Sequence, residues 1–356
     1  MTEVDSAAGP RREYLSFSGN TQDYFRIWAV NALLTVLTLG VYSAWAKVRR
    51  LRYVYGHTVL RHGRFDFHAD PLAILRGRII AVILLLIVLA TQVYKPAYVP
   101  VAGTLVAVVI PWLIVRSRMF TMRNTSYSNV RFGFVPAYWE SFRTVFFAGL
   151  LTFGTFGIGT PVAHYLRNRF VVRHTRYGNL PLKIDAVIWD FFFAYLITFV
   201  ASTIVIFPLL QSGFGLLGGL RVPGGEFGSY LPWVLPTMSA LAAYYVVAQF
   251  LSASTLRPTL NGSRLASRDN DEKEYRLGCD WSLNRLLFMY VVNFAAIVCS
   301  LGLLIPWAQM RVTRYLVNGT WIELDDALER VIAQQAADIS AVGEEVGSAF
   351  DMDIGL

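Results

Sequence analysis

The chain has 356 residues, of which 55% are hydrophobic and 16% charged, and its mean hydropathy is +0.45. Ordinary soluble domains carry about 25% charged residues, so the composition predicts a polytopic membrane protein and excludes a large water-soluble catalytic domain. The formal net charge is +8, but residues 321–356 hold nine acids against one arginine, so the body of the chain is basic and its C-terminal segment acidic.

Seven stretches contain no Asp, Glu, Lys or Arg and are long enough, or nearly so, to cross a bilayer as helices. The stretches are 27–46, 79–94, 96–115, 144–166, 191–220, 227–256 and 286–310. Lys95 and Arg221 are the only basic residues in two of the connections, which we therefore expect outside. The other connections are rich in arginine and read as cytoplasmic, as do both termini.

The first, fourth and seventh stretches have basic residues at both ends, which conflicts with a straight crossing. We therefore expect each to be a helical hairpin that enters from the cytoplasm and turns back at an interior glycine, namely Gly40, Gly157 and Gly302. Four helices then span the membrane. The alternative is seven ordinary spans, which would place one basic cluster outside.

Three segments align with one another without a gap: 38–58, 155–175 and 300–320. Each has a glycine, an alanine, an arginine, an aromatic residue and a threonine at matching positions. We interpret them as three copies of one unit, in which a glycine turn leads into an Arg-bearing amphipathic helix on the cytoplasmic face. Short alternating segments around each copy predict strands.

The sequence thus predicts a mainly α, polytopic membrane protein with spanning helix pairs, Gly-broken re-entrant hairpins in three repeats and a small cytoplasmic β layer. The expected segments are a cytoplasmic N-terminal segment (1–23), repeat 1 (24–70), transmembrane pair 1 (71–128), repeat 2 (129–185), transmembrane pair 2 (186–273), repeat 3 (274–324) and an acidic amphipathic tail (325–356). The acids of the tail could pair with Arg-rich loops of the same chain or with a partner protein.

Three stretches of sequence resemble a known family: YFRIWAVNALLTVLTLGVYSAWAKVRRLRY, LGLLIPWAQMRVTRYLVNGT and the ending GEEVGSAFDMDIGL. They are similar to the YjgN-like family of bacterial inner-membrane proteins, whose function is not established. The resemblance covers nearly the whole chain, and it implies an inner-membrane location. It implies no catalytic or binding residue.

The sequence contains no nucleotide-binding, hydrolase or zinc-protease motif, and we expect no enzyme, cofactor or nucleic-acid partner. His62, Asp66, His68 and Asp70 could gather around a metal, but solvated polar residues of the β layer are the preferred interpretation, so no metal site is predicted. Transport or translocation of a small solute or lipid fits broken helices beside spanning pairs. The alternative is a scaffold or regulator of another membrane protein, such as a membrane protease.

Each repeat carries an arginine followed by an aromatic ring: Arg52 with Tyr53, Arg169 with Phe170, and Arg314 with Tyr315. If the three arginines converge at the cytoplasmic interface, they predict a binding site for an anionic lipid phosphate, with the rings against glycerol or acyl chain. Alternatively, each arginine anchors its own helix end. Asn31 and Asn293 occupy matching positions and could hydrogen-bond across helices or line a polar path.

Overall fold

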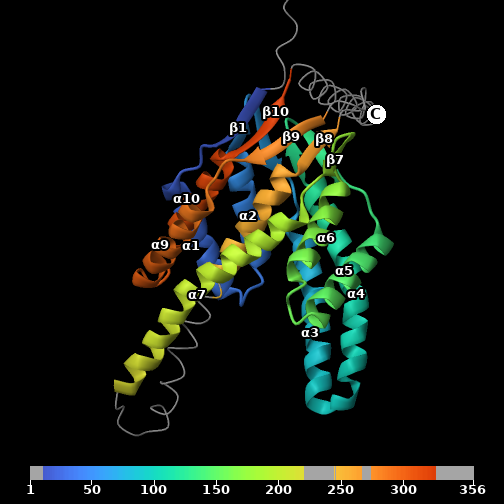
Figure 1. Ribbon diagram of the computed structural model, residues 1–356, viewed down its shortest axis with the longest axis vertical. Coiled ribbons are helices and arrows are strands. Elements are labelled where there is room, and N and C mark those ends of the chain that lie inside the picture. Colours follow the sequence, from blue (N-terminus) through green and yellow to red (C-terminus); the bar gives the residue numbers. More distant parts are fainter. Residues whose placement is uncertain (1–10, 220–243, 245, 267–273, 326–356) are drawn as a thin grey trace, which may run out of the picture.

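The computed structural model describes residues 11–219, 244, 246–266 and 274–325. Ten strands of these residues form a closed antiparallel barrel in the order β1-β10-β9-β8-β7-β6-β5-β4-β3-β2. The strands are β1 (Arg11–Phe17), β2 (Thr58–Leu60), β3 (Gly63–Phe67), β4 (Thr125–Tyr127), β5 (Val130–Phe134), β6 (Thr175–Tyr177), β7 (Leu180–Ile184), β8 (Ser263–Ala266), β9 (Glu274–Cys279) and β10 (Thr320–Leu324). The barrel occupies the upper part of Figure 1, and the helices extend from one of its ends.

Pairs of helices connect the strands, so that the chain leaves the barrel and returns to it five times. The helices are α1 (Thr21–Leu37), α2 (Ser43–Gly56), α3 (Pro71–Tyr94), α4 (Val99–Arg123), α5 (Tyr138–Gly154), α6 (Thr160–Arg173), α7 (Ile188–Gly219), α9 (Leu283–Cys299) and α10 (Ile305–Asn318). Residues 246–261 are also helical and return the chain from α7 to β8. We call each helix pair with its flanking strands a unit, numbered one to five along the chain.

Apolar side chains fill the interior of the barrel. Alternate residues of the strands point inward, and those that form the core are Leu60, Val130, Tyr177, Leu180, Leu265, Tyr275 and Leu324. Partly buried apolar residues, among them Phe65 and Phe132, pack against them. The barrel is therefore a packed core that holds the ends of the helix pairs in place.

The same backbone hydrogen bond joins strand to helix in all five units. In each case the N–H that follows a strand donates to the carbonyl of the residue just before the next strand. The five bonds are Ser18 N to His57 O (3.0 Å), His68 N to Asn124 O (2.8 Å), Val135 N to His174 O (2.8 Å), Asp185 N to Gly262 O (2.7 Å) and Asp280 N to Gly319 O (2.8 Å). The recurrence shows that every unit joins the barrel in the same way.

The prediction of a mainly α polytopic fold with a small β layer was wrong. The closed barrel is the centre from which all helix pairs start, and it takes strands from both ends of the described chain. Among the described residues, two helices, Pro71–Tyr94 and Pro96–Arg123, are long and apolar enough to cross a membrane. The three Gly-broken segments are pairs of separate helices that return to the barrel. The acidic tail after Asp325 lies outside the described residues.

Units one, three and five contain short helical hairpins with one common turn. The first helix has 17 residues and the second 14 in each of them. Gly40, Gly157 and Gly302 lie in the turns, and each has φ +91°. The residue before each glycine also has positive φ and is almost fully exposed: Leu39 (φ 50°, 95% exposed), Phe156 (φ 52°, 98%) and Leu301 (φ 50°, 95%).

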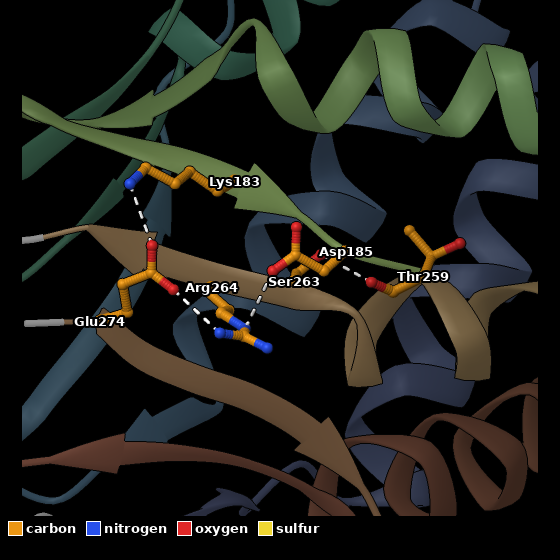
Figure 2. A network of polar contacts seen from close by, with 6 residues as sticks. All are labelled: Lys183, Asp185, Thr259, Ser263, Arg264 and Glu274. Atoms are coloured by element: carbon orange, nitrogen blue, oxygen red, sulfur yellow. Dashed lines mark hydrogen bonds and ion pairs between the residues drawn. The ribbon is translucent and has the colours of Figure 1, made fainter. Parts of the chain in front are cut away.

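A polar network crosses strands β7, β8 and β9 on the outside of the barrel (Figure 2). Lys183 lies directly opposite Arg264 in the sheet, and like charges in such a pair repel. Glu274 compensates for this repulsion, because its carboxylate accepts hydrogen bonds from Lys183 Nζ at 2.9 Å and from Arg264 Nη1 at 3.0 Å. The hydrogen bond from Lys183, followed by that from Arg264, lowers the pKa of Glu274. Asp185 adds an ion pair with Arg264 at 3.4 Å.

Candidate functional site

Two of the arginines predicted to bind lipid donate hydrogen bonds to backbone carbonyls. Arg52 of α2 donates from Nε to the carbonyl of Phe67 at 3.2 Å and from Nη2 to that of Ala69 at 3.1 Å. Arg314 of α10 donates to the carbonyl of Gly19 at 2.8 Å. Each guanidinium thus ties the last helix of its unit to the strand-to-helix link of the next unit around the barrel.

The aromatic residue beside each arginine secures its own unit. The hydroxyl of Tyr53 donates to the carbonyl of Asn20 at 2.7 Å and accepts from the Asn20 N–H at 2.8 Å. The Tyr315 hydroxyl accepts from the N–H of Ser282 at 2.9 Å. Phe170 has no hydroxyl, and its ring is buried in an apolar cluster. Tyr53 and Phe170 are buried and Tyr315 is partly buried, and contact of these rings with a lipid stays a prediction.

Arg169, the middle arginine, differs from its two counterparts. Its guanidinium lies 5.9 Å from the centre of the Tyr165 ring, and it forms no hydrogen bond or ion pair with the described part of the chain. It lines a pocket between α5 and α6 instead. The three guanidinium groups contact different parts of the fold. These contacts give no support to one shared site formed by Arg52, Arg169 and Arg314, which stays a prediction.

A larger cavity lies between helices of units one, four and five. Its volume is about 740 Å³, and it is lined by α2, α9, α10, the helical residues 246–261 and one residue of α1. Its polar lining consists of Tyr24, Arg50, Gln249, Tyr290, Asn293, Gln309 and Thr313. Its apolar lining includes Leu51, Val54, Val246, Phe294, Ile297, Ile305 and Val312.

Hydrogen bonds between neighbouring helices fix the walls of this cavity. The Tyr24 hydroxyl donates to Gln309 Oε1 at 2.6 Å and so joins α1 to α10. Asn293 is 4% exposed; its Oδ1 accepts from Arg311 Nη1 at 3.2 Å. Its counterpart Asn31 is also buried, at 7% exposed, but the Asn31 Oδ1 has no partner among the described residues. Asn293 therefore lines the cavity and joins α9 to α10. Asn31 is not part of the lining, and its side-chain oxygen joins no helices in the described part of the chain.

Apart from Asn293, the polar residues of the cavity were not singled out by the sequence, although one signal was present. Gln309 matches Lys47 and His164 in the other two hairpins. The His164 ring contacts the Tyr195 hydroxyl of α7 at 3.1 Å, much as Gln309 contacts a tyrosine of α1. A position that is polar in each copy but differs in residue type indicates a contact between successive units, where each copy meets a different neighbour.

Two of the four residues considered for a metal, His68 and Asp70, have structural roles. His68 Nε2 lies 2.8 Å from the Ser126 hydroxyl, and the Asp70 carboxylate accepts from the N–H of Leu72 at 3.0 Å, which caps α3. No cluster of three or more His, Cys, Asp or Glu side chains that could hold a metal occurs in the described ranges.

Comparison of the whole chain with known protein families identifies the family to which it belongs. Residues 12–349 match the model of the family DUF898, bacterial proteins of unknown function, and the chain belongs to that family. It is 23% identical over 377 aligned positions to "Inner membrane protein YjgN" of Salmonella typhimurium (strain LT2), which covers 92% of this chain and 93% of the relative. The expected family resemblance is thus confirmed.

The protein of the same name from Escherichia coli (strain K12) is similar over a shorter segment. It is 41% identical over 51 residues, which are 14% of this chain and 13% of that protein. No solved structure matches this one significantly.

Proposed function

We propose that this protein lies in the bacterial inner membrane and binds a small solute or lipid in the cavity between its helices, for transport or translocation. The observation that carries the proposal is the open cavity of about 740 Å³ among helices of three units. Binding sites for small molecules commonly measure about 300–1,000 Å³. The similarity to relatives named inner membrane proteins supports the location.

The cavity lining suits a molecule with one polar and one apolar end. The side chains of Arg50, Gln249 and Thr313 form no hydrogen bond or ion pair with the described residues, so their donors and acceptors can bind a ligand. Ile297 and Ile305 lie near the apolar turn that joins α9 to α10. An amphiphile would place its headgroup against Arg50, Gln249 and Thr313 and its apolar part toward the turn between α9 and α10.

The barrel geometry supports a topology with both termini in the cytoplasm. Arg11 of β1 pairs with Leu324 of β10, so the described chain begins and ends side by side on the barrel. The helix pairs all leave from one end of the barrel (Figure 1). If α3 and α4 cross the membrane, then the barrel and both ends of the described chain lie on one side of it, and the arginine-rich composition favours the cytoplasm.

A single cysteine at Lys95, between α3 and α4, should react with a membrane-impermeant thiol reagent added outside the inner membrane. A cysteine at Arg61, in the turn between β2 and β3, should react only after the membrane is opened. The native Cys279 and Cys299 are first replaced by serine. Labelling of the Arg61 position in sealed cells would contradict a cytoplasmic barrel.

The binding proposal is tested by filling the cavity. Thr313→Trp places a large ring in it, whereas Val298→Trp adds the same ring to an exposed position of α9. We expect mass spectrometry of extracts from the purified protein to find a compound enriched over bulk lipid in wild type and in Val298→Trp. Its amount should fall about tenfold in Thr313→Trp, as expected for a loss of about 1.4 kcal/mol of binding free energy.

Thermal unfolding of both variants near the wild-type temperature is the control for folding. Equal amounts of the compound in all three proteins, or no enriched compound in any, would contradict a binding cavity at this place.

A further inference from the structure

The hairpin of unit three contains a second, smaller pocket. It measures about 290 Å³ and lies between the first turns of α5 and the last turns of α6, next to the barrel. Three arginines line it, Arg143 from α5 and Arg169 and Arg173 from α6, together with the carboxylate of Glu140. It shares no lining residue with the larger cavity, so it is a separate site.

The positive charge of this pocket is largely uncompensated. Glu140 is its one acid, and its carboxylate pairs with His174 Nε2 at 3.3 Å. None of the three guanidinium groups forms a hydrogen bond or an ion pair with a residue that the structure describes; the contact of Arg169 with the Tyr165 ring is of the cation–π kind. Three cations gathered in one hollow repel one another unless an anion lies between them.

Comparison with the other two hairpins shows how the middle hairpin differs. Arg52 and Arg314, which match Arg169, are hydrogen-bonded to backbone carbonyls of the following unit. Arg173 is replaced by Gly56 in unit one and by Asn318 in unit five. The combination of a released Arg169 with an added Arg173 therefore distinguishes the middle hairpin.

We propose that this pocket binds a phosphate group, carried by an anionic phospholipid or by a small phosphorylated compound. Arginine is suited to this task because its planar guanidinium donates two parallel hydrogen bonds to phosphate oxygens. Three such groups around one hollow can surround a phosphate from several sides.

The wall beside the arginines adds an apolar surface. Phe147 and Leu166 line the pocket, and Phe147 is half exposed. Further along α5 the exposed apolar side chains of Leu150 and Phe153 continue toward the turn of the hairpin. A phosphate attached to an acyl chain would thus find an apolar path next to the charged pocket, whereas a free phosphorylated compound would use the charged part alone.

The test compares two variants of the full chain that lose the same charge. Arg169→Gln with Arg173→Gln removes two cations of the pocket, and Arg26→Gln with Arg131→Gln removes two exposed cations elsewhere. Each protein is placed in nanodiscs of phosphatidylcholine with a minor fraction of phosphatidylglycerol, and the retained phosphatidylglycerol is measured by native mass spectrometry. Inorganic phosphate is titrated separately against the protein in phosphatidylcholine alone, with thermal stabilisation as the readout.

We expect the pocket variant to retain about tenfold less ligand than the wild type and the control variant. Loss of bound phosphatidylglycerol without a response to inorganic phosphate identifies a lipid headgroup, whereas loss of the stabilisation by inorganic phosphate identifies a soluble phosphorylated ligand. Equal binding by the pocket variant and the control overturns the proposal. The experiment on the larger cavity changes residues of α9 and α10, whereas this one changes residues of α6. Failure of the proposed cavity can therefore be distinguished from failure of the proposed phosphate site.

A conservative variant guards against a folding defect. Arg169→Lys with Arg173→Lys keeps both charges but removes the paired hydrogen bonds of the guanidinium. It should bind ligand more weakly than wild type while unfolding at the same temperature. Binding by this variant equal to that of wild type would show that any cation suffices and would overturn recognition of phosphate by the arginines.

Discussion

Replacing Tyr177 with alanine should lower the free energy of unfolding of the barrel by about 3–5 kcal/mol, the range measured when large aromatic side chains are removed from cores. Tyr177 is 4% exposed, and its ring centre lies 5.0 Å from that of Phe132 and 6.0 Å from that of Tyr127. Its hydroxyl also donates to the carbonyl of Tyr127 at 3.0 Å. The closed sheet around it cannot collapse onto the space, because each strand is held by neighbours on both sides.

Two further variants separate packing from hydrogen bonding. Tyr177→Phe keeps the ring and loses only the hydroxyl, so it should cost about 1 kcal/mol. Arg176→Ala removes an exposed side chain of the same strand and should change little. Denaturant unfolding of the purified protein, monitored by hydrogen exchange of strand peptides, measures the free energy of unfolding of the three variants. An alanine variant as stable as the phenylalanine variant would show that the interior is loosely packed.

Replacing Gly302 with valine should destabilise the α9–α10 hairpin by about 1–3 kcal/mol, because a β-branched residue is strained at positive φ. The backbone there has φ +91°, and the nearest atom to an added Cβ is Ile305 Cδ1 at 3.6 Å. There is room for the side chain, so the expected cost comes from the backbone conformation. Gly40 and Gly157 have the same φ, and corresponding changes there should have similar costs.

Gly103 offers the matched control, since it also has open space around it but lies within helix α4 without positive φ. Valine at Gly103 should be close to neutral, because valine has a somewhat better helix propensity than glycine. The yield of folded protein and its unfolding temperature are compared for the two variants. A Gly302→Val protein as stable as Gly103→Val would contradict a strained turn.

Most of the strands could be predicted from the sequence, but β4, β8 and the closure into a barrel could not. Segments such as Gly63–Phe67 and Leu180–Ile184 alternate apolar and polar residues and were expected as strands. Strands β4 and β8, at Thr125–Tyr127 and Ser263–Ala266, have three and four residues, too few to show a period. Without them the strands form separate patches, and a small β layer was the natural conclusion.

The role of the shared arginines could not be predicted either, because it depends on the neighbouring unit. The sequence places Arg52, Arg169 and Arg314 at one position of the repeat, and this suggested one common ligand. In the fold, the first and last reach backbone carbonyls of the unit that follows them around the barrel. A carbonyl acceptor leaves no trace in the sequence, so a structural arginine and a ligand-binding one look alike until the fold is known.

The pairing of β1 with β10 sets the order in which the molecule can be assembled during biosynthesis. The turns β2–β3, β4–β5 and β6–β7 join strands that are close in sequence, so these pairs can form as soon as they leave the ribosome. The free edge of β1 stays open until the last strand has been made, after every helix pair has been synthesised. A chain interrupted before Thr320 therefore exposes two unpaired sheet edges, at β1 and at β9, which are templates for aggregation and targets for proteolytic quality control.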